Sequence, residues 1–403
     1  MDTVKLAWRN VWRNPRRSGV TIAAVSLALF VMILYSGMFI GYLKGMERGI
    51  VELEVGDAQI FAEGYRARPS IYKTIDDAEG LLTRLDEAGF RGSARLLGSG
   101  LAAAGDASSG ISMRAVDVAR DAEVGSIAEQ VEVGAWLDPA APDEVVIGRK
   151  LARTLGAEVG AELVILSQGT DGSMANDLYK VRGILRGISD AVDRGGVFMT
   201  HAAFRELMVF PEGAHQIIVR TPAGVPLPEA AARLKKLAPA QDANDWKTLM
   251  PNLASMLDSS RAAMMFMFVI IYVAIGIVVL NAMLMAVFER IREFGVLKAL
   301  GVGPLGVFGL ILIETFIQTG VAILIGVAAS VPANWYMVNV GIDMSFGDLT
   351  LMGMAVDPIW RSQVDASTYV TPILLLLVII TLAVLYPAIR AARVHPVEAM
   401  RYQ

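Results

Sequence analysis

Four long apolar runs constrain the fold of this 403-residue chain more than any other feature of its sequence. The runs cover residues 19–43, 262–288, 307–340 and 369–389. A helix needs about 20 apolar residues to cross the hydrocarbon core of a bilayer, and each run reaches that length. The mean hydropathy of the chain is +0.50, which is high for a soluble protein. We therefore predict four transmembrane helices.

The first run follows a basic start, so a cleaved signal peptide is the alternative to a membrane helix. The run is longer than the apolar core of a signal peptide, and no A-x-A-like site follows it, so we interpret it as a retained signal anchor. The third run continues past Pro332, which predicts a tilt or an extracytoplasmic extension. The chain has no cysteine, which excludes disulfides and thiol chemistry.

The short segments orient these helices, because lysine and arginine are enriched in cytoplasmic loops. Basic side chains are concentrated in three of them, residues 1–18, 289–303 and 390–403. The loop 341–368 carries Arg361 against four aspartates. We therefore expect both termini and residues 289–303 in the cytoplasm, and residues 44–261 and 341–368 outside.

Residues 44–261 are numerous enough to fold as a domain. They carry 24 basic and 31 acidic side chains, and this net charge of −7 does not favour nucleic-acid binding. Helical patterns alternate with β-branched runs bounded by turn residues. Helices are predicted over residues 74–89 and 226–238, a strand followed by a helix over 144–156, and strands over 161–167, 178–185, 195–200 and 215–221. The helix over 74–89 begins with a pattern that resembles a capping box, Thr74 with Asp77. From Trp246 onward, helical periodicity runs unbroken into the second apolar run. The predicted fold class is a polytopic α-helical membrane protein with a large α+β extracytoplasmic domain between the first and second helices.

No catalytic, cofactor or metal site is predicted. The stretch GVGPLG, residues 301–306, matches a dinucleotide motif letter for letter, but a charged helix precedes it where that motif needs a strand, so we interpret it as a turn. The sequence contains neither a P-loop nor a G-x-S-x-G motif. His201, His215 and His395 are not spaced as metal ligands, which favours ordinary structural roles.

Among the polar side chains inside the predicted spans, three are candidates for a role beyond lipid contact. Glu314 lies about two turns into the third span and Gln318 one turn further, and a carboxylate in lipid is costly enough to suggest a function. The readings left open are a packing or hydrogen-bonding contact near the inner interface and a proton or ion pathway. Asn281 in the second span is a further candidate for an interhelical hydrogen bond. Gly37, Gly41 and Gly45 form overlapping G-x-x-x-G steps, which predict a close contact or occur by chance.

Residues 289–303, ERIREFGVLKALGVG, place a short charged helix between the second and third spans. Phe294, Val296, Leu297 and Leu300 give it apolar contacts, and Gly301 and Gly303 permit a sharp turn into the next span. Such a segment suits docking to a cytoplasmic partner. The alternative is an interfacial helix that rests on lipid headgroups.

This segment resembles the coupling-helix signature of the FtsX/MacB/LolC–LolE permease family, roughly E-R-x-[RK]-E-[IF]-G-[VI]-x-[KR]-A-[LI]-G. Residues 7–25 resemble the family's amphipathic start, residues 143–166 and 179–185 its extracytoplasmic core domain, and residues 386–401 its C-terminal ending. The resemblance covers essentially the whole chain.

The resemblance implies a non-catalytic permease subunit of an ABC transporter in the bacterial inner membrane, with its large domain in the periplasm. Two permeases, identical or paralogous, would pair and bind a cytoplasmic ATPase dimer that holds ATP and Mg²⁺, and movement would pass to the periplasmic domains. Only 18 residues precede the first span, so the ATPase is expected on a separate chain. The residues implied in ATPase binding are Glu289, Arg290, Arg292, Glu293, Phe294, Leu297, Lys298 and Gly301.

Within the family, chain length and the stretch YMVNVGIDMS, residues 336–345, favour a LolC/LolE-like releaser of lipoproteins, with membrane lipid and a periplasmic lipoprotein or carrier as further partners. Three alternatives stay open. They are an FtsX-like scaffold that regulates a cell-wall hydrolase, MacB-like efflux of peptides or small molecules, and a ligand-sensing receptor, which the lack of a signalling domain disfavours.

Overall fold

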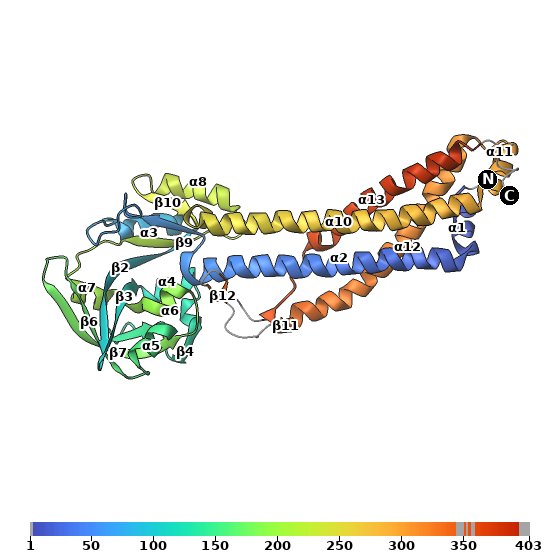
Figure 1. Ribbon diagram of the computed structural model, residues 1–403. Coiled ribbons are helices and arrows are strands. Elements are labelled where there is room, and N and C mark those ends of the chain that lie inside the picture. Colours follow the sequence, from blue (N-terminus) through green and yellow to red (C-terminus); the bar gives the residue numbers. More distant parts are fainter. Residues whose placement is uncertain (1–2, 344–349, 352–353, 356–358, 395–403) are drawn as a thin grey trace. The chain divides into compact units, whose positions relative to one another are not determined.

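The computed structural model describes residues 3–343, 350–351, 354–355 and 359–394 (Figure 1). The chain divides into two compact units. The helical unit comprises residues 1–44, 256–344 and 358–403, and the α+β unit comprises residues 45–255 and 345–357. His395 and the tail that follows it lie outside the described residues.

Within the described part of the chain, four helices are long and apolar enough to cross a membrane. The helices that enter the helical unit are α1 (Thr3–Arg13), α2 (Pro15–Ile50), α10 (Pro251–Glu289), α11 (Ile291–Ala299), α12 (Pro304–Asn339) and α13 (Ala366–Ala392). The predicted fold class, four membrane helices with an α+β domain between the first and second, is confirmed. Helix α12 continues through Pro332, whose missing N–H and ring do not end it there.

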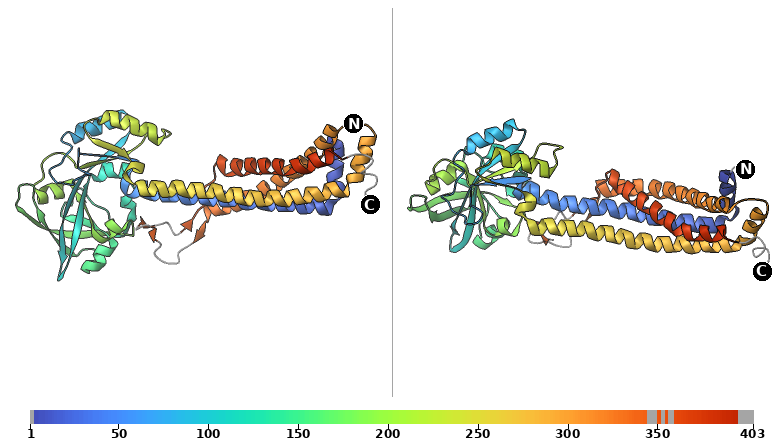
Figure 2. Two further views of the ribbon diagram at one scale, coloured as in Figure 1. Left: turned by 45° about the horizontal axis from the view of Figure 1, so that its top comes forward. Right: turned by 90° about the horizontal axis from the view of Figure 1, so that it is seen from above.

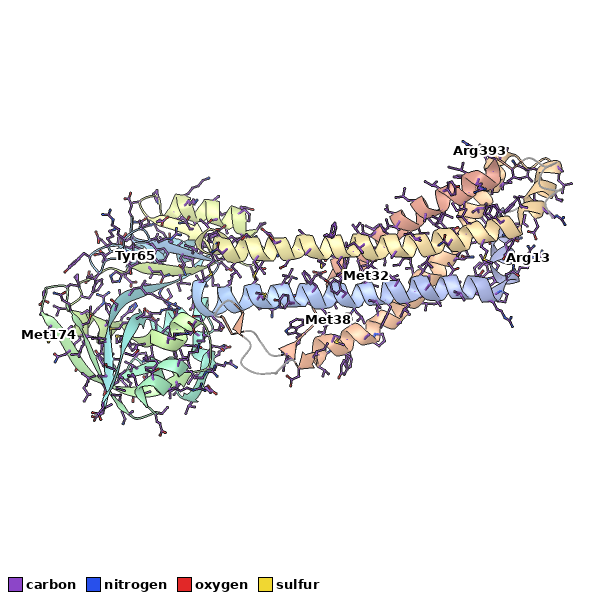
Figure 3. The ribbon with its side chains drawn as sticks, viewed as in Figure 1. Arg13, Met32, Met38, Tyr65, Met174 and Arg393 are labelled. Atoms are coloured by element: carbon purple, nitrogen blue, oxygen red, sulfur yellow. The ribbon has the colours of Figure 1, made fainter. Side chains whose placement is uncertain are left out.

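The membrane helices pack around a common apolar core, which includes Leu29, Met32, Tyr272, Leu310 and Ile380. All views place α1 and α11 at the same end of the helical unit (Figures 1 and 2). Arg13 and Arg393 lie at that end, whereas Met32 lies midway along α2 (Figure 3). Two short strands, β11 (Ile342–Asp343) and β14 (Ile359–Trp360), pair antiparallel between α12 and α13.

The α+β unit is built on a mixed sheet. Its strands are β1 (Ala58–Phe61), β2 (Arg91–Ala104), β3 (Ala107–Val116), β4 (Val131–Gly134), β5 (Glu144–Ile147), β6 (Glu162–Gln168), β7 (Met174–Leu185), β8 (Gly196–Thr200), β9 (Gln216–Arg220) and β10 (Asp242–Asp245). Its helices are α3 (Ala78–Glu87), α4 (Val118–Val124), α5 (Arg149–Leu155), α6 (Asp190–Gly195), α7 (His201–Met208), α8 (Leu227–Leu237) and α9 (Trp246–Leu249), with a π-helix at Val51–Val55 and a 3₁₀ helix at Ile127–Gln130. The strands β12 (Thr350–Leu351) and β13 (Met354–Ala355) pair antiparallel as a separate two-stranded sheet.

The long strand β2 closes part of this sheet into a ring. Its first residues pair with β9, while Leu101–Ala103 pair with Val164–Leu166 of β6. Because β6 also pairs with β7, the strands β2, β3, β8, β5, β7 and β6 form a closed circuit. Apolar side chains from these strands share one buried core, among them Leu96, Met113, Ile147, Leu163 and Val197.

Two local predictions in this unit are wrong. Helix α3 begins at Ala78, and Asp77 alone caps it by accepting a hydrogen bond from the backbone N–H of Gly80 at 3.1 Å, while the Thr74 hydroxyl donates to Asp76 instead. The helical pattern that starts at Trp246 is interrupted after Leu249, and α10 begins anew at Pro251. The proline ring disfavours helical geometry in the residue before it, which explains the break.

Two buried polar contacts bind distant parts of the α+β unit together. Arg95 and Asp121, whose side chains are 3% and 2% exposed, form a bidentate ion pair with contacts of 2.8–3.1 Å. The ring of His215 is fully buried; its Nδ1 accepts from the Leu97 N–H and its Nε2 donates to the Ile71 carbonyl oxygen, both at 3.0 Å. Burial lowers the pKa of His215, which keeps the ring neutral. These roles are structural, and the described residues contain no cluster of potential metal ligands.

Candidate coupling site

The segment between the second and third membrane helices is a short helix held between two turns. Helix α10 ends at Glu289, Arg290 leaves helical geometry, and α11 follows. Beyond α11, the N–H of Gly301 bonds to the Lys298 carbonyl and the N–H of Val302 to the Leu297 carbonyl, each at 3.0 Å. This is a Schellman ending, and it requires the positive φ of +94° that Gly301 adopts. Gly303 has φ −66°, a conformation open to any residue, so the predicted special role of the second glycine is wrong.

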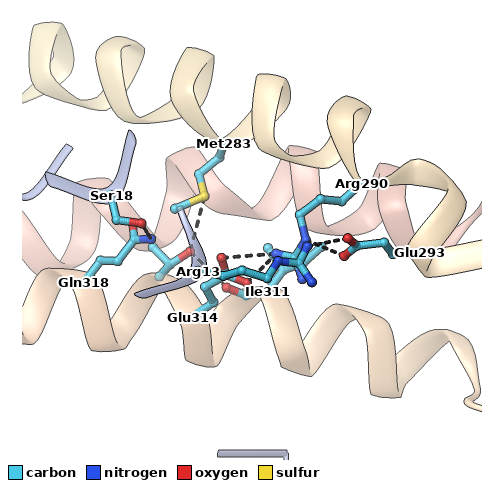
Figure 4. A network of polar contacts seen from close by, with 9 residues as sticks. Arg13, Ser18, Met283, Arg290, Glu293, Ile311, Glu314 and Gln318 are labelled. Atoms are coloured by element: carbon cyan, nitrogen blue, oxygen red, sulfur yellow. Dashed lines mark hydrogen bonds and ion pairs between the residues drawn. The ribbon is translucent and has the colours of Figure 1, made fainter. Parts of the chain in front are cut away.

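A chain of ion pairs links α11 to its neighbours (Figure 4). The guanidinium of Arg290 contacts both carboxylate oxygens of Glu314 on α12, at 3.2 and 2.9 Å, and its Nε donates to Glu293 at 2.9 Å. Glu293 in turn pairs with Arg13 at the end of α1. Arg290 also lies over the ring of Phe294, 5.3 Å from its centroid. Arg290 and Glu293 together therefore join α1, α11 and α12.

The ion pairs in this series differ in burial, and therefore in strength. The side chains of Arg290 and Glu314 are 8% and 7% exposed, so their attraction is little screened by water. Arg13 and Glu293 are about half exposed, and such pairs contribute little. Burial alone would lower the pKa of Arg290, but Glu314 and Glu293 outweigh it and raise that pKa. Burial likewise raises the pKa of Glu293, but hydrogen bonds from Arg290 and Arg13 bring it below its usual value. Both directions favour the charged forms of Arg290 and Glu293.

Lys298 attaches the other end of α11 to the last membrane helix. Its ammonium donates to the carbonyl oxygens of Ala392 and Val394, the second at 2.8 Å. These carbonyls lie at the C-terminus of α13, where a cation is favoured because the last carbonyls of a helix lack intrahelical partners. Lys298 was predicted as an ATPase contact, but in this arrangement its charge is used within the chain.

The structure divides the remaining predicted contact residues between two faces of α11. Phe294 is 1% exposed and packs in the membrane-helix core, and Leu297 is half-buried against the same core. The assignment of Phe294 as a partner contact is therefore corrected: its ring fixes the helix to the bundle. The outward face carries Val296, 49% exposed, and Leu300, 78% exposed. Glu289, Arg292 and Glu293 are also exposed.

The three polar side chains singled out inside the spans differ in the contacts that they make. Glu314 is the partner of Arg290, and Gln318 donates a hydrogen bond of 3.4 Å to the Ser18 hydroxyl on α2. Both contacts agree with the packing interpretation of these residues. Asn281 is exposed on α10, and among the described residues the predicted hydrogen bond from its side chain to another helix is not seen.

Two of the three α2 glycines predicted to form a contact face make close contacts, both with a loop segment and one also with neighbouring helices. A Cβ added to Gly37 would lie 2.4 Å from the Ser362 hydroxyl, and one added to Gly41 would lie 2.1 Å from the Arg361 carbonyl oxygen. The N–H of Gln363 also donates to the Gly37 carbonyl at 3.0 Å. Gly45 has nothing within 4 Å of such a Cβ. A Cβ added to Gly37 would also lie 3.1 Å from the Asn334 side chain of α12 and 3.4 Å from the Thr368 side chain of α13, so the predicted close helix contact is present at Gly37 and residues 361–363 share it.

Sequence reasoning did not anticipate Arg13 as the partner of Glu293, or the carbonyls of Ala392 and Val394 as the partners of Lys298. Arg13 is one of several basic side chains near the N-terminus, and composition does not single it out. Backbone carbonyls carry no side-chain signal at all, so Lys298 could not have been paired from the sequence.

Two family models match this chain, one over its N-terminal part and one over its C-terminal part. The model of the MacB-like periplasmic core domain matches residues 18–237, more than half of the chain, and that of the FtsX-like permease C-terminal domain matches residues 265–396. The chain belongs to the FtsX/MacB/LolC family of ABC transporter permeases. The second match includes the whole of α11, and the role of α11 as a coupling helix stays a prediction.

Similar proteins agree with this assignment. A lipoprotein-releasing system transmembrane protein LolC of Xylella fastidiosa is 24% identical over 303 residues, 72% of this chain and 73% of that protein. The LolC of Neisseria meningitidis serogroup B is 22% identical over 311 residues, 73% of this chain and 74% of that protein. The ABC transporter permease YknZ of Bacillus subtilis is 32% identical over 128 residues, 32% of this chain and 28% of that protein.

Among solved structures, the periplasmic region of MacB from Actinobacillus actinomycetemcomitans is similar with a TM-score of 0.37 and 14% identity, covering 52% of this chain and 98% of that one. The extracellular domain of a YknZ transporter from Gram-positive bacteria follows with a TM-score of 0.32 and 14% identity, covering 47% and 98%. Permeases of this family generally pair and work with an ATPase partner, and the permease subunit itself is typically non-catalytic.

Proposed function

We propose that this permease couples ATP hydrolysis by a cytoplasmic ATPase to movement of its α+β unit in the periplasm of a bacterial inner membrane, and that the coupled process is lipoprotein release. The observation that carries this proposal is the construction of α11. A short helix is fixed on its inner face by Phe294 and Arg290 while its outer face presents exposed aliphatic side chains.

Docking and transmission make different demands, and α11 meets both. Docking needs an apolar anchor that a partner can enclose, and Val296 with Leu300 supplies one. Transmission needs a rigid attachment, which the buried Arg290–Glu314 pair and the Lys298 contacts supply at the two ends of the helix. Helices α2 and α10 are each unbroken from the helical unit into residues of the α+β unit, so a displacement at one end has a stiff covalent route.

The cargo is inferred from the relatives. The LolC proteins, which match over nearly three quarters of their length, are described as components of lipoprotein-releasing systems. Efflux of peptides and regulation of a cell-wall hydrolase are the other outcomes that the test must separate.

Docking is tested by replacing Leu300 with Asp. Leu300 is 78% exposed, so the variant should fold normally yet lose ATPase recovery in mild detergent, because removing a central anchor of an interface costs about 2 kcal/mol or more. Val159→Asp, an exposed aliphatic position in the α+β unit, is the matched control. Unchanged ATPase binding by Leu300→Asp would leave α11 as an interfacial helix only.

Cargo is tested with the permease and its co-purified ATPase in proteoliposomes that contain a fluorescent triacylated lipopeptide. ATP-dependent transfer of the lipopeptide to a soluble acceptor supports lipoprotein release. Co-purification of a cell-wall hydrolase without transfer, or export of a water-soluble peptide instead, would replace it. The orientation is tested by a reporter fused at Gly172, in the turn between β6 and β7, since a cytoplasmic signal there would overturn the topology.

A further inference from the structure

An open cleft of about 490 Å³ lies where the turn between α1 and α2 meets the end of α10. Asn14, Pro15, Arg16, Met285 and Glu289 line it, and all five are exposed within this chain. The cleft lies wholly in the helical unit. It is separate from the outward face of α11, although Glu289 directly precedes the turn at which α11 begins.

The neighbouring side chains place this cleft at the level of lipid headgroups. Val20, an exposed apolar residue on α2, comes one turn after Arg16, and Phe288, the last apolar residue of α10, adjoins Glu289. On α1, Trp8 and Trp12 are both about half exposed, and tryptophan is enriched where membrane meets water. A cleft at this depth is open to the polar part of phospholipids.

The lining carries both charges that a zwitterionic headgroup needs. The guanidinium of Arg16 offers a planar set of donors suited to a phosphate, and the Asn14 amide offers another. The carboxylate of Glu289 suits an ammonium group, and the flexible thioether of Met285 suits the first methylenes of an acyl chain. We propose that this cleft binds an aminophospholipid of the phosphatidylethanolamine type, with its phosphate on Arg16 and its ammonium on Glu289.

This pairing predicts an order of preference among headgroups. The primary ammonium of phosphatidylethanolamine donates hydrogen bonds to a carboxylate, whereas the quaternary ammonium of phosphatidylcholine has no N–H to donate. Phosphatidylglycerol carries a net negative charge and has no cationic group to pair with Glu289. A bound phosphatidylethanolamine would bridge the start of α2 and the end of α10 next to the coupling segment.

The test is native mass spectrometry of the full chain, titrated in detergent with the three lipids bearing identical acyl chains. We expect phosphatidylethanolamine to bind roughly tenfold more tightly than phosphatidylglycerol, since a hydrogen bond to a charged group contributes on that order. Glu289→Gln should abolish this preference, and Glu289→Asp should retain it. Arg16→Gln should weaken the binding of all three lipids, whereas Arg9→Gln, an exposed arginine on α1 outside the cleft, should not.

Equal or tighter binding of phosphatidylglycerol, or an unchanged preference in Glu289→Gln, would overturn the proposal. Equal losses in Arg9→Gln and Arg16→Gln would also overturn it, because they would show a general attraction between basic residues and phosphate. Gel filtration and far-UV circular dichroism of each variant establish that the comparison is made on folded protein. No ATPase is present, so the result is independent of the proposed docking of α11.

Discussion

Removing the carboxylate of Glu314 should destabilise the helical unit and loosen α11. Glu314→Leu leaves the guanidinium of Arg290 in a site where it is 8% exposed. Arginine cannot be neutralised by losing a proton, so the charge must stay buried or pull the end of α10 toward water. At a separation of about 4 Å and an effective dielectric of about 20, the lost attraction is about 4 kcal/mol. Because Glu293 remains as a second partner, we expect a net cost of about 3 kcal/mol.

The reverse substitution should cost less. Arg290→Met leaves Glu314 alone, but a buried carboxyl group can take up a proton and lose its charge. The double variant Arg290→Met/Glu314→Leu replaces both charges with apolar groups of similar size, and it should be closer to the parent than Glu314→Leu is. Glu314→Gln keeps a hydrogen-bond acceptor and should also be tolerated better than Glu314→Leu.

The assay is the free energy of unfolding from SDS titration in mixed micelles, followed by circular dichroism, with the four proteins arranged as a double-mutant cycle. ATPase binding should survive in each of them, because neither side chain belongs to the outward face of α11. A cost below about 1 kcal/mol for Glu314→Leu, with a coupling energy near zero, would refute the view that this pair fixes α11. Complete loss of transport in Glu314→Gln with the complex intact would instead indicate a role for the charge itself.

Three further changes test other parts of the chain. Gly301→Ala should lower stability by about 1–2 kcal/mol and uncouple ATP hydrolysis from transport, because φ is +94° at this position. Gly303→Ala is the control and should be neutral, since its φ is −66° and an added Cβ meets nothing within 4 Å at either position. Equal effects of the two variants in coupled ATPase assays would contradict this. Asp121→Ala strands the buried guanidinium of Arg95 and should lower the free energy of unfolding of the α+β unit by about 3–5 kcal/mol, measured by urea denaturation, with a smaller loss for Asp121→Asn. The pKa of His215 is lower in the folded protein than its unfolded value of about 6.5, so near that pH the unfolded state binds more protons than the folded state. The free energy of unfolding should therefore be highest above pH 6.5 and decrease as the pH is lowered below 6.5. His215→Asn should reduce the difference in melting temperature between pH 7.5 and pH 5.5. An unchanged difference would show that other titratable groups cause the pH dependence.

The fold class could be predicted because its signals are local. Four apolar runs are long enough to cross a bilayer, and no soluble fold needs them. The strands β6 to β9 lie in runs whose local sequence predicts a strand. By contrast, β2 and β3 went unpredicted, because Arg91–Val116 is rich in glycine, alanine and serine, which are poor strand formers on their own. Their pairing with each other and with β6, β8 and β9 makes them strands.

The amino-acid sequence by itself determined that a charged amphipathic helix lies between the second and third spans, and its motif determined the family. The tertiary structure alone decided which face of that helix is buried. Phe294 and Val296 are two residues apart and equally apolar, and only packing against the bundle places the first inside and the second outside. The partner of Glu314 was likewise undecided until Arg290, 24 positions earlier, was brought within 2.9 Å. Helical periodicity gives the relative angles of side chains around an axis, whereas the rotation of that axis against its neighbours is set by contacts between residues far apart in the chain.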